Sequence, residues 1–150
     1  MADLVMVGAG PQALALSCLL LQKRSRLHRR LRIVDPSGRW LSRWKRQMER
    51  YEIPWLRSPS PHHPHPNAHA LRRFAHRQQR HRQLEGAYGL PHTDLFAAFC
   101  LEVIAEFALE KLVQAAPPPS RPGGAGRRFD HARGWRRPQR GPTTRRAAAS

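Results

Sequence analysis

A turn that contains two glycines, Gly8-Ala9-Gly10, separates two apolar segments near the start of the chain and constrains its fold most strongly. The segment before it, Leu4–Val7, is short and wholly apolar, which is typical of a parallel strand buried on both faces. After the turn, Pro11–Lys23 is rich in leucine, opens on a proline and lacks a helix breaker, which predicts a helix. A second short strand is expected at Leu31–Val34. Strand, helix and strand in this order predict a βαβ unit with two parallel strands.

The same turn begins a GxGxxA pattern that runs from Gly8 to Ala13. Gly8 would permit the tight turn, Gly10 would let the backbone approach a pyrophosphate, and Ala13 would let the helix pack closely on the strand. The pyrophosphate would then lie on the free N–H groups at the helix N-terminus. Asp35, which follows the second strand, would bind the hydroxyls of an adenosine ribose and disfavour the 2′-phosphate of NADP. The pattern therefore predicts a dinucleotide site; the alternative is a glycine turn that simply precedes an ordinary helix.

The chain between the second strand and residue 116 has weaker signals. Residues 39–66 are rich in Trp and Pro, and we expect an irregular segment there. Residues 68–83 predict a basic helix, and residues 86–91 predict a linker. We expect Thr93 to cap a further helix, after which Leu112-Val113 either ends the helix or opens a third strand. The apolar positions of that helix recur every three or four residues, at Phe96, Phe99, Cys100, Val103, Ile104 and Phe107, with Glu102, Glu106 and Glu110 on the opposite face.

Composition changes sharply after residue 116. Residues 117–150 contain nine arginines, one acid, six prolines and five glycines, but no Leu, Ile, Val or Met. Such a segment cannot repay its ordering entropy by burial, so we expect a disordered basic tail. Because GC-rich DNA read in a wrong frame gives this composition, the tail is either a frameshifted or truncated end or a genuine one. The predicted fold class is α/β: a Rossmann-like βαβ domain with an incomplete parallel sheet in residues 1–116, followed by the tail.

A series of segments spread over residues 3–113 resembles one family of enzymes. The segments are Asp3–Ala15, Asp35–Trp40, Trp44, Met48, Leu56–Pro59 with His62–Pro64, and Leu95–Cys100. They resemble the FAD/NAD(P)-binding oxidoreductases that are similar to flavin-dependent N-hydroxylating monooxygenases of the lysine and ornithine N-hydroxylase type. The glycine pattern is common to many flavoproteins, whereas the Trp–Met–Leu-Arg-Ser-Pro-His-His-Pro series is more specific.

The resemblance implies a set of FAD-binding residues. Gly8, Ala9, Gly10, Pro11 and Gln12 would bind the FAD diphosphate, Asp35 the adenosine ribose, and Trp44, Met48 and Arg57 the region of the isoalloxazine. In the parent enzyme NAD(P)H would reduce the flavin, which would activate O₂ toward a small-molecule substrate. Family members carry a second dinucleotide motif for NAD(P)H, which this sequence lacks. We therefore expect the FAD-binding portion of such an oxidoreductase, inactive by itself.

Two other functions compete with this interpretation. The net charge of +17, with arginines at positions 72, 73, 77, 80 and 82, would suit a nucleic-acid-binding protein. No helix-turn-helix, zinc or RNP-like signature accompanies this charge, so nucleic acid is the weaker expectation. The third interpretation is a non-catalytic remnant.

The sequence disfavours several other kinds of site. Cys18 and Cys100 lie in apolar helical patterns, so we expect two buried, reduced thiols. We predict no metal site, because prolines extend the histidine-rich stretch and no acid or cysteine lies near His62, His63, His65 and His69. No apolar run reaches the roughly 18–20 residues that a bilayer requires, and the chain does not open like a signal peptide. We therefore expect a cytoplasmic protein without a membrane partner.

Overall fold

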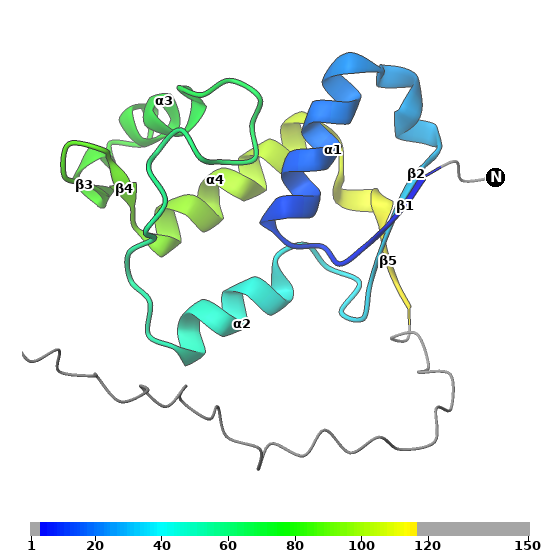
Figure 1. Cartoon of the computed structure of the whole chain (residues 1–150), viewed down its shortest axis with the longest axis horizontal. Helices are drawn as coiled ribbons and strands as arrows, with labels where there is room; N and C mark the ends of the chain where they lie inside the picture. Colours follow the sequence, from blue (N-terminus) through cyan, green and yellow to red (C-terminus); the bar gives the residue numbers. More distant parts are fainter. Residues whose placement is uncertain (1–3, 117–150) are drawn as a thin grey trace, which may run out of the picture. The chain divides into compact units, whose positions relative to one another are not determined.

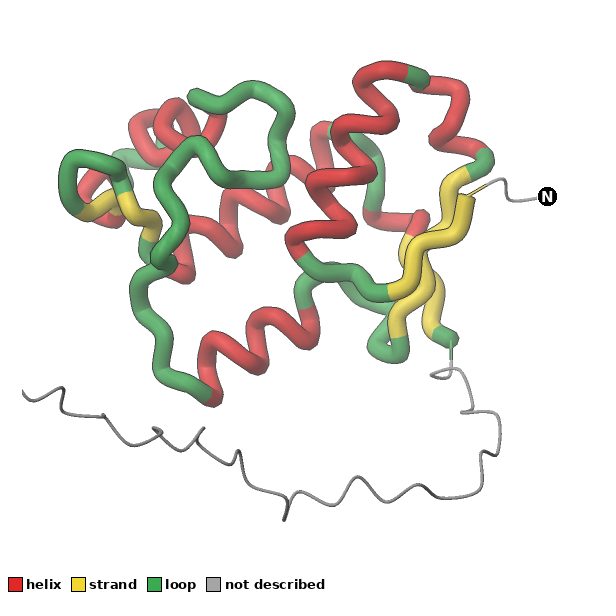
Figure 2. Tube along the Cα trace, in the orientation of Figure 1, coloured by secondary structure: helices red, strands yellow, loops and turns green. Residues whose placement is uncertain are grey.

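A computed structural model describes residues 4–116 of the chain. These residues form a mixed α/β structure with four α-helices and a three-stranded parallel sheet (Figure 1, Figure 2). The predicted disordered tail, residues 117–150, lies outside the described residues.

The sheet confirms the predicted parallel pair and adds a third strand. β1 (Leu4–Val7) pairs in parallel with β2 (Leu31–Asp35), and β2 pairs in parallel with β5 (Val113–Ala115), which gives the order β1-β2-β5. Ile33 lies opposite both Met6 and Val113 in the register. Leu112-Val113 therefore leads into a strand and does not end the preceding helix.

One face of this sheet is covered and the other is open within residues 4–116. Met6, Leu31 and Ile33 on the covered face are buried. Val5 and Val7 alternate with them and are 55% and 77% exposed. The prediction that Leu4–Val7 is buried on both faces is therefore wrong, because the described helices lie on one side of the sheet only (Figure 1). An apolar run without alternation does not reveal this difference.

The helices include one that the sequence analysis missed. They are α1 (Pro11–Lys23), α2 (Ser42–Arg50), α3 (Ala70–Arg77) and α4 (Thr93–Glu106), with short 3₁₀ turns at Ser25–Arg29, His81–Gln83 and Glu110–Leu112. A short antiparallel hairpin of β3 (Leu84–Glu85) and β4 (Leu90–Pro91), each two residues long, encloses part of the predicted linker. The predicted bounds of α1 are confirmed at both ends, whereas the predictions for the segments that contain α2, α3 and α4 require correction.

Residues 39–66 are not wholly irregular, because α2 occupies part of them. α2 has no buried residue and is mostly charged, so it lacks the apolar stripe by which helices are usually recognised. Leu41, Trp44 and Met48 are nevertheless spaced as neighbours on one helical face. Pro and Gly are also absent from positions 39–53, so a helix is permitted there.

Three helices end in the same backbone motif without glycine. After α2, α3 and α4 a residue with positive φ follows the C-cap: Glu52 (48°), Gln79 (53°) and Ala108 (52°). In each case the next amide N–H bonds back five residues, as Arg80 does to the Ala75 carbonyl at 2.7 Å. This is the Schellman motif, in which glycine is the usual residue. Because no glycine marks these helix ends in the sequence, the predicted helices extend too far. The helix predicted over 68–83 is longer than α3, and Phe107 and Glu110 lie beyond the end of α4.

The start of α4 also differs from expectation. His92, not Thr93, is the N-cap, and its Nδ1 accepts a hydrogen bond from the Asp94 backbone N–H at 3.2 Å. The Thr93 hydroxyl donates instead to the Ile53 carbonyl at 2.6 Å, and so ties α4 to the segment after α2. Histidine is an uncommon N-cap, so propensity favoured the neighbouring threonine.

The core lies between the covered face of the sheet and the helices. α1 and α4 contact each other, and the buried residues of α1 recur at helical spacing, at Leu14, Ser17, Cys18 and Leu21. The buried face of α4 comprises Leu95, Phe96, Phe99, Cys100, Val103 and Ile104. The expectation of two buried, free thiols at Cys18 and Cys100 is confirmed.

Candidate functional site

The turn between β1 and α1 has two glycines with different requirements. Gly8 has φ +95°, a conformation that side chains with a Cβ rarely adopt, so the backbone requires glycine there. Gly10 is the N-cap of α1 with φ −88°, which any residue can adopt. A Cβ at Gly10 would have only the Gln12 Oε1 atom near it, at 3.6 Å. Neither backbone geometry nor packing within residues 4–116 requires glycine at position 10.

Hydrogen bonds attach this turn to the end of β2 and to the residue before α2. The Gly8 N–H donates to the Val34 carbonyl at 2.7 Å, and the Leu41 N–H donates to the Ala9 carbonyl at 2.7 Å. Leu41 is fully buried and precedes α2, so the turn and the start of α2 are held together. The first turn of α1 then follows, and N–H groups there have no acceptor within the helix.

Asp35 at the end of β2 is buried and well supplied with hydrogen-bond donors. One carboxylate oxygen accepts from the Ala9 N–H at 3.1 Å. The other accepts from the Ser37 N–H at 2.8 Å and from the Ser37 hydroxyl. Burial acts to raise the pKa of Asp35, but the hydrogen bonds from Ser37 and Ala9 and the charge of Arg46 outweigh it, so the pKa lies below its usual value.

Most of the predicted cofactor-binding residues line one cleft of about 700 Å³ at the carboxyl ends of β1 and β2. Gly8, Ala9, Gly10, Pro11, Gln12, Asp35 and Trp44 all lie in its walls. Ser37, Arg43, Arg46 and Gln47 also line it and were not predicted. The arginines belong to α2, so only a prediction of that helix could have placed them here.

Arg57 and Met48 occupy two other cavities. Arg57 lines one of about 360 Å³ together with Pro11, Gln12 and Trp44, which also line the cleft. Met48 lines a third cavity of about 680 Å³ between α2 and α4, in which Trp44 is the one residue shared with the cleft. The structure therefore brings Arg57 near the glycine turn but does not bring Met48 there. Trp44 borders all three spaces.

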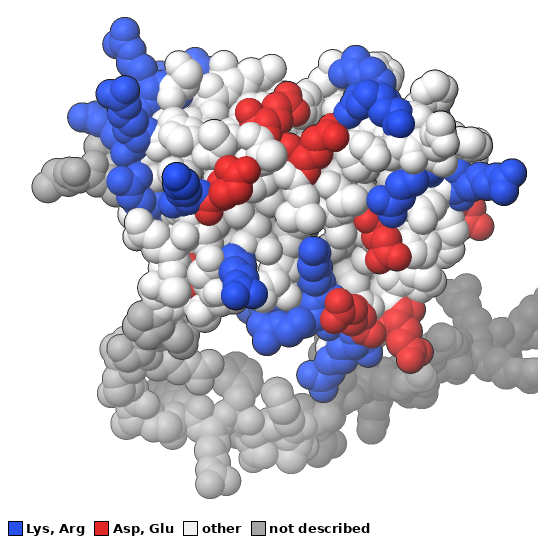
Figure 3. Space-filling model, turned by 180° about the vertical axis from the view of Figure 1, so that it is seen from behind, with Lys and Arg blue, Asp and Glu red and all other residues white. Residues whose placement is uncertain are grey.

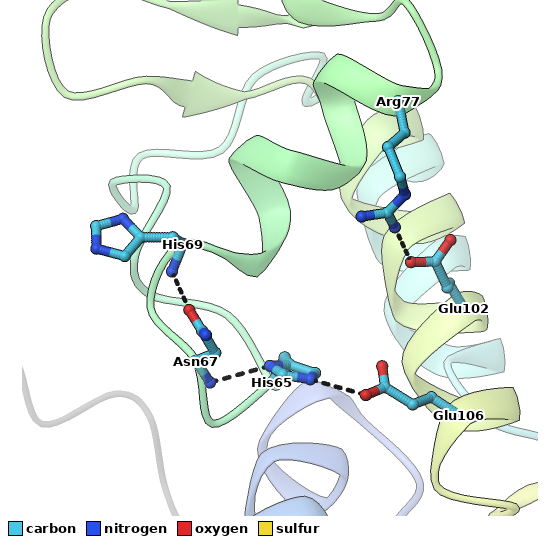
Figure 4. Close-up of polar contacts among 6 residues, drawn as sticks. All are labelled: His65, Asn67, His69, Arg77, Glu102 and Glu106. Carbon is cyan, nitrogen blue, oxygen red and sulfur yellow. Dashed lines mark hydrogen bonds and ion pairs between the residues drawn. The ribbon is translucent and has the colours of Figure 1, made fainter.

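The histidine-rich stretch packs against α4. The His65 Nδ1 accepts a hydrogen bond from the Asn67 N–H at 2.9 Å, and its Nε2 lies 3.1 Å from a carboxylate oxygen of Glu106 (Figure 4). The His63 ring packs edge-on against Phe99 at 5.1 Å between ring centroids. Burial lowers the pKa of His63, which favours the neutral ring. In residues 4–116 no three His, Cys, Asp or Glu side chains gather as a metal site requires.

Several arginines of the predicted basic region bind other parts of the protein. Arg77 of α3 forms an ion pair with Glu102 of α4 (Figure 4), and the Arg72 Nε donates to the Ser60 hydroxyl at 2.7 Å. The Arg80 Nε donates to the Gln83 side chain at 2.8 Å. On the face shown in Figure 3, basic side chains form separate groups with acidic side chains among them. This arrangement does not favour a nucleic-acid interface on that face.

Comparison with known proteins adds no family assignment, since no family model, curated protein or solved structure matches the chain. Among the described helices, none has both the length and the apolar character needed to cross a membrane.

Proposed function

We propose that residues 4–116 bind FAD in the cleft at the carboxyl ends of β1 and β2. The observation that carries this proposal is Gly10, which lies in the wall of the cleft although neither its φ nor its packing calls for glycine. A ligand that approaches the backbone at the start of α1 would explain the absence of a side chain there. The strand order β1-β2-β5, with all strands parallel, is also the order of one half of a doubly wound sheet. On this proposal the domain is Rossmann-like.

The residues present suit FAD in charge and position. Gly10, Pro11 and Gln12 at the N-terminus of α1 would hold the diphosphate, where N–H groups and the helix dipole favour an anion. Asp35 lies in the same cleft, and its carboxylate would face the adenosine ribose. Trp44, Pro11 and Gln12 border both the cleft and the cavity that contains Arg57. An elongated dinucleotide could therefore extend from the cleft into that cavity past Trp44.

The resemblance to N-hydroxylating monooxygenases suggests the reaction class. We infer that the chain represents the FAD-binding portion of a flavin-dependent NAD(P)H oxidoreductase of this kind. The bound flavin would supply electron transfer and oxygen activation. The protein residues would bind the diphosphate at the glycine turn, orient the ring system beside Trp44 and place the positive charge of Arg57 near it. Met48, in the third cavity, has no part in this proposal.

FAD binding to the full 150-residue chain tests the proposal. Flavin fluorescence should fall on titration with the protein, and protein passed through a desalting column should retain flavin absorbance. Tryptophan fluorescence should also fall, and Trp44→Phe should reduce that change because this tryptophan borders both cavities. Protein that is folded by circular dichroism but neither quenches nor retains FAD would contradict the proposal.

A further inference from the structure

Arg43 and Arg46 of α2 line the same cleft as the glycine turn. Both are exposed, and within residues 4–116 the side chain of neither forms a hydrogen bond or an ion pair within 4 Å. Arg72, Arg77 and Arg80, by contrast, bond to other side chains. The guanidinium groups of Arg43 and Arg46 are therefore available to a ligand in the cleft.

The charge of the cleft is positive. Among its lining residues within 4–116, the charged side chains are Asp35, Arg43 and Arg46. The Asp35 carboxylate receives its hydrogen bonds from Ala9 and Ser37, so it does not occupy the donors of either arginine. The charge of Arg46 nevertheless reaches Asp35, since it contributes to the lowered pKa of that carboxyl. The positive charge of Arg46 on α2 thus acts on a group inside the cleft.

The character of α2 is consistent with a ligand-binding role. It has no fully buried residue, and Trp44 packs against Phe96 of α4 with 5.5 Å between ring centroids. Its N-terminal end is also fixed by the hydrogen bond from the Leu41 N–H to the Ala9 carbonyl, within the glycine turn. This bond places Arg43, two residues further along, near the N-terminus of α1. Planar guanidinium groups match phosphate oxygens in geometry and charge.

We infer that Arg43 and Arg46 bind the diphosphate of the dinucleotide, as a second set of cationic ligands in addition to the N-terminus of α1. The inference rests on the proposed function in placing a dinucleotide in the cleft, and it identifies residues that the glycine pattern does not include. It also assigns to α2 a share in selecting ligands by their phosphate charge.

The test compares ADP, which has the diphosphate, with adenosine, which has none. Arg43→Gln/Arg46→Gln in the full chain should weaken ADP binding by roughly tenfold or more, the effect expected from a lost charged hydrogen bond. The dependence of ADP affinity on salt should also become shallower. Adenosine should bind both proteins with the same affinity. The matched control is Lys45→Gln/Arg50→Gln, which removes the same charge from the same helix at positions outside the cleft.

The outcomes separate this inference from the proposed function. The inference is overturned if the double variant and the control bind ADP with the same affinity and the same salt dependence. It is also overturned if the wild-type protein does not bind ADP. If FAD binds all three proteins equally, the proposed function stands and the role of the arginines fails. If ADP binding depends on the arginines but FAD does not bind, the arginine site stands and the FAD proposal fails. Circular dichroism of each variant checks that its helices are intact.

Discussion

The carboxylate of Asp35 accepts a hydrogen bond from the backbone N–H of Ala9 at 3.1 Å and thereby joins the end of β2 to the glycine turn after β1. The sequence pattern predicts that the acid at this position binds a ribose. The structure adds that Asp35 positions the turn itself, because Ala9 lies between the two glycines. The two roles are compatible, since a carboxylate has about four acceptor positions and three protein donors occupy part of them.

Replacement of Asp35 should therefore affect both binding and folding. Asp35→Ala should weaken FAD binding by about 1.5–3 kcal/mol, the usual range for a lost hydrogen bond to a charged group. It should also lower the free energy of unfolding by about 1–3 kcal/mol, because the buried Ala9 N–H and the partly buried Ser37 N–H lose their acceptor. Flavin titration measures the first effect and urea denaturation the second.

A control variant distinguishes the two roles of Asp35. Ser37→Ala removes one hydroxyl donor to Asp35 but leaves the bond to Ala9, so it should alter FAD affinity less than Asp35→Ala does. An FAD dissociation constant unchanged in Asp35→Ala would mean that the carboxylate serves the turn alone.

The lowered pKa of Asp35 predicts how its contribution depends on pH. Near the ordinary carboxyl pKa of 3.8 the unfolded chain binds more protons than the folded one, so stability rises with pH there. The contribution of Asp35 is fully present above this value and is lost as pH falls through the lower pKa of the folded state. The difference in unfolding free energy between wild type and Asp35→Asn should therefore shrink below about pH 4. A difference that stays constant down to pH 2 would contradict this expectation.

The βαβ start of the chain could be predicted because its signals are local. The apolar run before Gly8, the proline at position 11 and the second apolar run each specify one element without help from distant residues. The approach of Asp35 to the glycine turn could be predicted for the same reason, whereas the wall of the cleft that α2 supplies could not. The exposure of Val5 and Val7 could not be predicted, since it depends on which elements pack against the sheet.

The rest of the site depends on tertiary contacts that leave little trace in the sequence. α2 exposes most of its side chains, so its pattern of Trp44 and Met48 is short and easily missed. The separation of Met48 from Arg57 into different cavities follows from how α2 packs beside α4, and residue spacing does not encode it. Helix ends at Gln79 and Ala108 rely on left-handed residues that are not glycine, which removes the usual stop signal.

The two cysteines should be unreactive in the folded protein. Burial raises the pKa of the Cys18 thiol to about 12, and burial likewise raises the pKa of Cys100. Because the thiolate is the reactive form, a disulfide reagent such as DTNB should label neither residue in the native state at pH 8. Both should react promptly in guanidinium chloride. Rapid labelling of native protein would show that the packing between α1 and α4 opens readily.

Substitution of Gly10 tests whether a ligand accounts for the glycine at that position. Gly10→Val should abolish FAD retention, because its side chain would extend into the space at the start of α1 where a diphosphate must lie. The same variant should fold, since φ at this position is −88° and a Cβ there meets only Gln12 Oε1 at 3.6 Å. Gly10→Ala should show a smaller loss of affinity with native circular dichroism.

Gly8→Ala supplies the contrast, because the two glycines of the turn are required for different reasons. A Cβ at Gly8 has no heavy atom of the described residues within 4 Å, but φ of +95° strains any residue other than glycine. Gly8→Ala should therefore destabilise the fold by about 1–3 kcal/mol, whereas Gly10→Val should impair binding more than stability. Equal flavin content in Gly10→Val and wild type after incubation with FAD would show that the backbone at position 10 does not contact the cofactor. Loss of stability in both variants to the same extent would instead assign both glycines to the turn.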